Sequence, residues 1–298
     1  MQIEIERLND QGEGICFVDN KICFVPNTVI GDIIDLKITT KGSKFYRGSV
    51  NKIIKESPLR IKSYCPFNLE CGGCSFSTIS INDSLTFKKN KLEKVLNKFG
   101  GIKTSVEIIP SPNHLNYRDK ITLHVKDYKF GYYKEGTNDL ISINECKIAS
   151  IPINNFLKIL SKYNFKEGSV VIRSNYNDEL LIHFIGNSKV TLVDTDLKIV
   201  GILQNNKVLM GQDYFIEVIN DNYFVVSFDS FFQINRDIAS ILFDLLDKYI
   251  LKNKTILDLY CGVGTLGLSV AKKESKVYGI EIIKNAILNS VKNAKINR

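Results

Sequence analysis

Three cysteines lie close together in the stretch CPFNLECGGC, residues 65–74, with the spacing C-x5-C-x2-C. The chain has seven cysteines, and an odd number leaves at least one outside any disulfide. The N-terminus, MQIEIERLND, has no apolar core of a secretory signal. Because thiols of non-secreted proteins are rarely paired in disulfides, metal binding or thiol chemistry is the better interpretation of this stretch.

A metal site built on these thiols needs a fourth ligand, because structural zinc and cubane iron–sulfur clusters both take four. Cys146, in INECKIA, is the remaining cysteine of the middle region. Gly72 and Gly73 allow a tight bend with N–H groups facing the sulfurs. This favours an iron–sulfur site over a zinc knuckle, which uses paired C-x2-C units. Zinc, and thiols without a metal, remain the alternatives.

A second constellation is ILDLYCGVGTLGL, residues 256–268, whose glycines at 262–267 match G-x-G-x-x-G. Asp258, four residues before the first glycine, makes the order D-x-x-x-G-x-G that is usual in S-adenosylmethionine enzymes. Glu281 ends the next apolar stretch, where a carboxylate can bond ribose hydroxyls. NAD carries the same ribose, so Glu281 does not separate the two cofactors. Cys261 is interpreted as a small residue packed beneath the cofactor rather than as a nucleophile.

The bulk composition sets limits on partners and location. Lys and Arg outnumber Asp and Glu by 40 to 32, and the net charge of +8 is compatible with a polyanion such as nucleic acid. No apolar run approaches the roughly 18–20 residues of a membrane helix. We therefore expect a cytoplasmic, monomeric protein without a membrane partner, long enough for two or three domains.

Residues 1–57 are predicted to form an OB-like β-barrel. Five short alternating apolar runs are separated by turn clusters such as QGEG and DNK. Cys16 and Cys23 fall inside these runs and should be small core residues. Basic residues on the later strands, with Phe45 and Tyr46 between them, would suit single-stranded RNA, although a solvated barrel edge with core aromatics explains them equally well. These basic residues are Lys37, Lys41, Lys44, Arg47 and Lys52.

The middle part, residues 58–230, is predicted to be an α+β domain that carries the cysteine stretch. Asn82-Asp83-Ser84 should cap a helix over residues 84–99. Residues 105–228 read mostly as strands, interrupted by a helix near residues 151–163.

Residues 231–298 change to an α/β pattern. An amphipathic helix over residues 237–250 precedes a strand KTILDLY, a glycine turn entering a helix, a strand KVYGIEI and a helix KNAILNSVKNAKINR. This β-α-β-α order opens a doubly wound methyltransferase sheet. Two such strands are fewer than a complete doubly wound sheet has, and they should keep an unpaired apolar edge.

In combination these features resemble the RNA uracil-5 methyltransferases that carry an N-terminal TRAM barrel and an iron–sulfur site. The resemblance covers all 298 residues and rests on motifs that occur in order along the chain. The motifs are FVPNTVIGD at 24–32, CPFNLECGGC, ECKIA around Cys146, NYRDK at 116–120, GYY at 131–133, SFDSFFQIN at 227–235, DLYCGVGTLGL and GIEI followed by NA.

The resemblance implies methyl transfer from S-adenosylmethionine to C5 of a uridine, in 23S ribosomal RNA rather than transfer RNA. In such enzymes a cysteine thiolate adds to C6 of the flipped-out base, which makes C5 nucleophilic. It also implies four cofactor-binding residues, Gln233, Tyr260, Thr265 and Glu281, and four ligands of a [4Fe–4S] cluster, Cys65, Cys71, Cys74 and Cys146. Without the family, Gln233 would be interpreted as a helix N-terminal residue that satisfies backbone groups.

Two departures from the family stand out. Ser77-Thr78 replaces the usual Gln-His after the cysteines, with little expected consequence for the cluster. The family's later Asp-Pro-Pro-Arg and Ser-Cys-Asn stretches, which carry the nucleophile, do not occur. We therefore assign no catalytic residue and expect a truncated chain that is inactive alone. The alternatives are an RNA-binding iron–sulfur protein without catalysis and a dinucleotide-dependent oxidoreductase.

Overall fold

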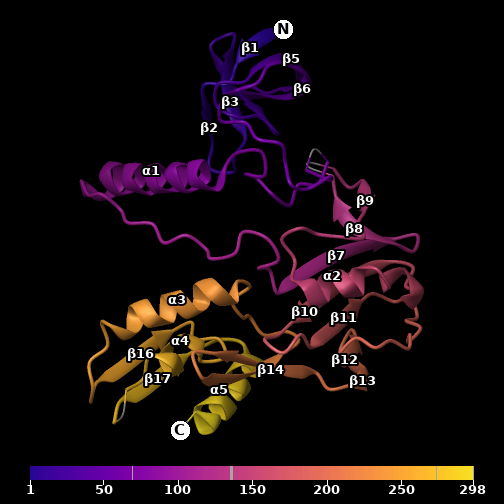
Figure 1. Ribbon diagram of the computed structural model, residues 1–298, viewed down its shortest axis with the longest axis vertical. Helices are drawn as coiled ribbons and strands as arrows, with labels where there is room; N and C mark the ends of the chain where they lie inside the picture. The colour runs from indigo at the N-terminus through magenta and orange to yellow at the C-terminus, as the bar shows by residue number, and fades with distance from the viewer. Residues whose placement is uncertain (69, 135–136, 273, 298) are drawn as a thin grey trace. The chain divides into compact units, whose positions relative to one another are not determined.

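The structure is a computed structural model that describes residues 1–68, 70–134, 137–272 and 274–297 (Figure 1). It divides into two compact units. Unit 1 comprises Met1–Pro110 and Tyr133–Asp139, and unit 2 comprises Ser111–Tyr132 and Leu140–Arg298. The expected three-domain division at residues 57 and 230 remains a prediction.

Unit 1 begins with a six-stranded sheet in the order β1-β5-β6-β4-β3-β2. Its strands are β1 (Gln2–Glu4), β2 (Arg7–Leu8), β3 (Gly14–Val18), β4 (Lys21–Val25), β5 (Ile33–Lys41) and β6 (Phe45–Lys55). Cys16 and Cys23 face each other across β3 and β4, and both are fully buried, as predicted. In this order β1 and β2 are edges, so closure into an OB-like barrel remains a prediction.

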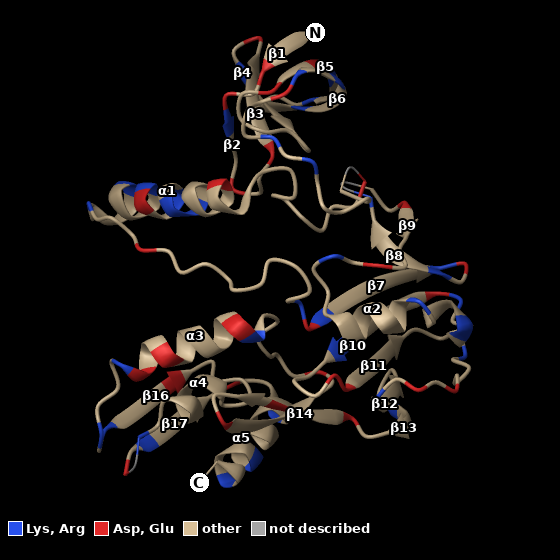
Figure 2. Ribbon diagram, viewed as in Figure 1, with Lys and Arg blue, Asp and Glu red and all other residues tan. Residues whose placement is uncertain are grey.

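Helix α1 (Ile81–Gly100) follows the cysteine stretch and carries several lysines (Figure 2). Its N-cap is Ser80, whose hydroxyl accepts a 3.1 Å hydrogen bond from the Asp83 amide. The predicted cap at Asn82-Asp83-Ser84 is therefore wrong, because those residues already lie inside the first turn. Gly101, in the left-handed conformation with φ 67°, ends the helix.

Unit 2 contains a seven-stranded sheet in the order β13-β12-β11-β10-β7-β8-β9. The strands are β7 (Lys120–Lys126), β8 (Lys129–Tyr133), β9 (Leu140–Ser142), β10 (Gly168–Ser174), β11 (Leu180–Ile185), β12 (Ile199–Gln204) and β13 (Lys207–Gly211). The predicted helix near residues 151–163 is present as two pieces, α2 (Ile151–Leu157) and a 3₁₀ turn η1 (Leu160–Tyr163).

The rest of unit 2 combines a hairpin with the expected α/β pattern. Strands β14 (Tyr214–Ile219) and β15 (Asn222–Ser227) pair antiparallel and are followed by α3 (Arg236–Asp247). The β-α-β-α order is confirmed as β16 (Thr255–Leu259), α4 (Thr265–Ser269), β17 (Lys276–Ile280) and α5 (Lys284–Ile296), with β16 and β17 parallel. One core cluster joins these parts: Phe224 and Val226 of β15, Phe243 of α3, Val263 and Ala286 belong to it.

The sheet formed by β16 and β17 keeps an exposed apolar face. Leu257 and Leu259 alternate along β16, and Tyr278 and Ile280 along β17, and each is more than half exposed. Among the described residues these two strands pair only with each other, in line with the predicted unpaired edge. Within the residues that the structure describes, no helix is long and apolar enough to cross a bilayer.

Candidate cofactor site

The glycine turn after β16 has an unusual backbone. Tyr260, Gly262 and Gly264 all have positive φ, of 61°, 56° and 84°. The left-handed region costs an ordinary side chain energy, and glycine adopts it freely. A Cβ added at Gly262 would meet nothing within 4 Å, so the backbone there is open to a ligand. Tyr260 accepts this conformation while its ring is 89% exposed, which is the kind of strain that functional sites retain.

Two carboxylates hold the turn. Oδ2 of Asp258 accepts a 2.9 Å hydrogen bond from the Gly267 amide in α4. A Cβ at Gly267 would lie 2.9 Å from that same oxygen, so the third glycine of the motif permits this approach. Oε2 of Glu281, at the end of β17, accepts a 3.0 Å bond from the Gly262 amide. The motif therefore links both strands through backbone amides.

Glu281 is also fixed by its own segment. Its Oε1 accepts bonds from the amides of Ile283 at 2.9 Å and Ile282 at 2.7 Å. These amides, that of Ile283 most of all, and the amide of Gly262 lower the pKa of the Glu281 carboxyl against the opposing effect of burial. The carboxylate is thus ionised and oriented at the carboxyl end of β17, where parallel α/β sheets bind ligands.

Gln233 lies between β15 and α3, in a loop that we count as residues 227–235, beginning at Ser227, the last residue of β15. It follows the buried Phe232 and is partly exposed. The N-cap of α3 is Asn235, whose side-chain oxygen accepts a 3.1 Å bond from the Ile238 amide. Gln233 is therefore not the residue that caps this helix. This argues against the interpretation of Gln233 as a helix N-terminal residue that satisfies backbone groups.

The structure gathers three of the four predicted cofactor residues at one turn. Tyr260 precedes the first glycine, Thr265 begins α4, and Glu281 bonds to Gly262. Gln233 lies on a separate loop, which α5 holds by side-chain amides of Asn285 and Asn289. Sequence analysis missed these asparagines, although their four-residue spacing in KNAILNSVKNAKINR was a usable signal.

These residues fit a nucleoside cofactor. An open backbone at Gly262, an exposed aromatic ring at Tyr260 and an oriented carboxylate at Glu281 are the groups that a ribose and an amino-acid tail require.

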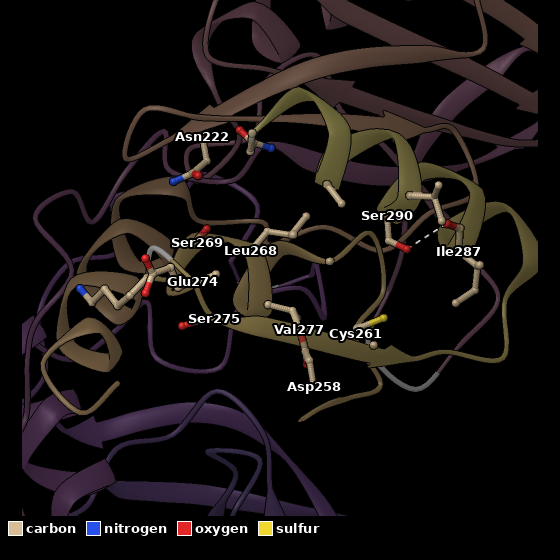
Figure 3. A pocket seen from close by; sticks show the side chains of 17 residues that line it. Asn222, Asp258, Cys261, Leu268, Ser269, Glu274, Ser275, Val277, Ile287 and Ser290 are labelled. Carbon is tan, nitrogen blue, oxygen red and sulfur yellow. Dashed lines mark hydrogen bonds between the residues drawn. The ribbon is translucent and has the colours of Figure 1, made fainter. Parts of the chain in front are cut away.

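A cavity of about 740 Å³ lies beside the turn, between the strands and helices α4 and α5 (Figure 3). It shares Cys261 and Gly264 with the turn, and Ser290 of α5 lines it. The hydroxyls of Ser269 and Ser275 line it too, buried and without a hydrogen-bond partner in the described structure. Gln233, Tyr260, Thr265 and Glu281 are not among its lining residues. The cavity is therefore distinct from the turn surface that carries the predicted cofactor residues.

The three clustered cysteines occupy a loop of unit 1 that is closed at its base. Arg60 and Ile79 form an isolated bridge, and the Ile61 amide donates a 2.8 Å bond to the Thr78 carbonyl. Within the loop, the Cys71 amide donates a 2.8 Å bond to the Phe67 carbonyl. A Cβ at Gly73 would lie 3.3 Å from the Cys71 sulfur, so this glycine lets the chain pass close to a thiol.

Cys146 belongs to unit 2 and sits in a turn held by Asn154 of α2. The Asn154 side-chain oxygen accepts a 2.8 Å bond from the Cys146 amide, and its nitrogen donates to the Cys146 and Ala149 carbonyls at 3.0 and 2.9 Å. All seven cysteines lie among the described residues, and none forms a disulfide. Across that described part, no three His, Cys, Asp or Glu side chains form a group that could hold a metal ion. The ligand set Cys65, Cys71, Cys74 and Cys146 therefore stays a prediction.

The predicted basic residues of the N-terminal sheet are exposed, but its two predicted aromatic residues, Phe45 and Tyr46, differ in exposure. Tyr46 is 8% exposed and packs in the core, with Lys21 and Lys41 within 6 Å of its ring. Phe45 is 45% exposed and makes an edge contact with Phe24. Only Phe45 of the two predicted aromatics offers a ring to a partner.

Comparison with known proteins agrees with this organisation. Residues 1–50 match the TRAM domain model, and residues 185–298 match the model described as tRNA (Uracil-5-)-methyltransferase. A protein of Halalkalibacterium halodurans named as an uncharacterized RNA methyltransferase is 26% identical, with 100% of this chain and 75% of that protein covered. One with the same description from Fusobacterium nucleatum is 29% identical, covering 100% and 74%.

A solved structure shares the fold over the whole chain. The tRNA (uracil-54, C5)-methyltransferase of Pyrococcus abyssi, in complex with S-adenosyl-L-homocysteine, superimposes with a TM-score of 0.80 at 24% identity, covering 100% of this chain and 77% of that one. The N-terminal part therefore matches a TRAM domain, and the C-terminal part matches a tRNA (uracil-5-)-methyltransferase family domain. Over its full length the chain is similar to proteins named as RNA methyltransferases.

Proposed function

We propose that the chain binds S-adenosylmethionine at the glycine turn and acts in methylation of C5 of a uridine in RNA. The observation that carries this proposal is the open, left-handed turn at Tyr260 and Gly262, fixed by the Glu281 carboxylate. The solved Pyrococcus abyssi relative, whose fold the chain shares, was obtained with S-adenosyl-L-homocysteine. The cofactor supplies an electrophilic methyl group when it is bound.

The chain's own residues would orient that methyl donor. The backbone at Gly262 admits the methionine part of the cofactor, because no neighbouring atom lies where a Cβ would project. The Glu281 carboxylate accepts hydrogen bonds from the ribose hydroxyls. Tyr260 offers an exposed ring to the apolar parts of the ligand. Gln233, on its own loop, supplies a neutral amide that can donate and accept hydrogen bonds without adding charge next to a sulfonium.

RNA is the proposed partner, through the TRAM domain and its exposed basic residues. The cysteine motif leads us to propose 23S ribosomal RNA, whereas the matched family model and the Pyrococcus abyssi structure carry the names of tRNA enzymes. A binding competition decides between them. Equal amounts of labelled transfer RNA and a ribosomal RNA fragment, at fixed salt, should favour the ribosomal fragment if the proposal holds.

We also propose a [4Fe–4S] cluster held by Cys65, Cys71, Cys74 and Cys146. Its support is the residue type, the spacing and the close approach of Gly73 to a thiol. Anaerobic purification with metal analysis tests it. Iron with a broad visible absorption band, lost in Cys146→Ser, is the expected result, and Cys261→Ser is the matched control. One zinc without visible absorption contradicts the iron–sulfur assignment.

The cofactor proposal is tested by calorimetric titration of the 298-residue chain with S-adenosylhomocysteine and, in parallel, NAD. Binding of S-adenosylhomocysteine alone supports it. Binding of NAD alone would instead favour an oxidoreductase, and binding of neither would contradict the cofactor assignment.

A further inference from the structure

Helix α5 carries an asparagine at every fourth position: Asn285, Asn289, Asn293 and, just after the helix, Asn297. Positions four apart lie on one face of a helix. Asparagine is a poor residue for a helix interior, and burying its amide costs free energy unless hydrogen bonds satisfy it. Asn289 is 3% exposed and Asn293 is fully buried. Such a row therefore needs a tertiary explanation.

Part of the explanation is the edge of β15. In the part of the chain that the structure describes, this strand pairs with β14 on one side only, and α5 lies along its other side. The Asn293 side chain accepts a 2.7 Å bond from the Val225 amide and donates a 3.3 Å bond to the Val225 carbonyl. Two residues away on the strand, Asn297 makes the same pair of bonds with Tyr223, at 2.7 and 2.8 Å. The row thus replaces a missing strand partner.

Asn289 and Asn293 make contacts that edge protection alone does not require. Asn293 also donates a 2.9 Å bond to the carbonyl of Val263, between the first two glycines of the cofactor turn. Asn289 donates to the hydroxyls of Ser227 and Ser230 at 2.8 and 3.2 Å, in the loop that carries Gln233. Two adjacent members of one helical face therefore hold the two segments predicted to bind the cofactor.

The loop is held from its other side by Arg173 of β10. The buried Arg173 guanidinium donates to the carbonyls of Ser227 and Ser230 at 3.1 and 2.8 Å. Backbone and hydroxyl groups of the same two serines are thus bonded from a strand and from a helix. A loop held at both serines has little freedom to move Gln233 relative to the glycine turn.

We infer that Asn289 and Asn293 are positioning residues of the cofactor site, which set the spacing between the glycine turn and the Gln233 loop. The inference rests on the proposed function. The side-chain amides of Asn289 and Asn293 project from the same helix, and each is bonded to one of the two segments. Loss of either side chain should therefore loosen one segment without removing any atom that touches the ligand.

The experiment compares Asn289→Ala and Asn293→Ala with Asn297→Ala in the 298-residue chain. Asn297 has the same residue type on the same face, but among the described residues its side-chain bonds reach only Tyr223 and its own helix. Calorimetric titration with S-adenosylhomocysteine should show a dissociation constant at least about tenfold higher for the first two variants, and a change below about twofold for Asn297→Ala.

A second measurement separates positioning from general destabilisation. Amide hydrogen exchange without ligand should speed up at Gly262 and Gly264 in Asn293→Ala and in the 227–235 loop in Asn289→Ala, each variant leaving the other segment unchanged. If Asn293→Ala does not fold, a double-mutant cycle of Asn289→Ala and Ser230→Ala tests the inference instead. The effects of the two substitutions on the affinity for S-adenosylhomocysteine should then be non-additive.

The outcomes are distinct. If the unmodified chain binds no S-adenosylhomocysteine, the proposed function is overturned. If it binds, and all three asparagine variants bind with the same affinity, the proposed function stands and the positioning role is overturned.

Discussion

The Gly262 amide donates a 3.0 Å hydrogen bond to the Glu281 carboxylate, although the two residues lie at the ends of different strands. The same carboxylate accepts hydrogen bonds from the amides of Ile282 and Ile283. One side chain therefore closes the glycine turn of β16 onto the end of β17. The residue that the sequence assigns to ribose binding is thus also one of the two carboxylates that hold the turn.

Glu281→Ala should weaken cofactor binding more than loss of a ribose contact alone, because three backbone amides lose their acceptor. We expect the dissociation constant for S-adenosylhomocysteine to rise by more than about tenfold, and Glu281→Gln, which keeps an acceptor oxygen, to lose less. Titration calorimetry measures both. Asp247→Ala, which removes a surface ion pair with Lys272, is the control. Equal binding by Glu281→Ala and the unmodified chain contradicts the assignment.

Tyr260→Gly should change stability and binding in opposite directions. Glycine relieves the left-handed strain at φ 61°, for a gain of about 1 kcal/mol in the free energy of unfolding, but removes the exposed ring. Urea unfolding and titration with S-adenosylhomocysteine measure the two effects.

The matched control is Tyr128→Gly in the β7–β8 hairpin. Tyr128 has φ 62° and is half exposed, with no proposed ligand role. It should gain similar stability and leave binding unchanged. A Tyr260→Gly variant with undiminished affinity would show that the ring does not contact the cofactor.

Glu217 should make the stability of unit 2 depend on pH. Burial raises the pKa of its carboxyl to about 7, against the opposing charge of Arg236, whose guanidinium lies 3.9 Å away. Between the ordinary pKa of 4.5 and about 7, the folded protein binds more protons than the unfolded chain. The contribution of Glu217 to stability should therefore be greatest below the ordinary pKa and fall as the pH rises towards 7.

The measurement is the urea midpoint between pH 4 and pH 8. Glu217→Gln should flatten this part of the profile, because the neutral amide mimics the protonated acid. Glu4→Gln, at an exposed position of β1, should not. If the slope of the urea midpoint against pH is unchanged in Glu217→Gln, the pH dependence belongs to other groups. Asp119 is the next residue to substitute, because burial raises the pKa of its carboxyl to about 6.

Asp32 should show the opposite pH dependence in unit 1. Burial alone would raise the pKa of this fully buried carboxyl, but Arg60, at 2.5 and 3.0 Å, and the amides of Ser57 and Val29 outweigh it and lower the pKa. Its contribution is present above the unfolded pKa and is lost as the pH falls through the lower folded value.

Asp32→Asn should destabilise unit 1 by about 3–5 kcal/mol, because Arg60 would be left buried without its charge partner. Asp35→Asn weakens exposed contacts, with the N-terminal ammonium and with the Asn51 side-chain amide, and should destabilise the protein much less. Thermal unfolding followed by circular dichroism compares the two. Similar melting temperatures for both variants would contradict the role of the buried pair.

The sequence by itself determined the elements with strong local signals. The β-α-β-α order from Thr255 to Ile296 followed from apolar runs broken by a glycine turn, and burial of Cys16 and Cys23 followed from alternation. It failed at the start of α1, since several residues near position 82 have capping side chains and only the folded chain shows that Ser80 reaches an open amide. Local propensity ranks such candidates poorly.

Tertiary structure alone decided what the polar side chains do. Glu281 and Asp258 both face backbone amides of the turn, and Asn289 and Asn293 join that turn to the Gln233 loop. No local rule reports these bonds, because they join segments that are about ten to seventy residues apart in the chain and their energies depend on burial that exists only after folding. Periodicity identifies which face of a helix is buried, whereas the partner of a buried amide depends on which segments the completed fold brings together.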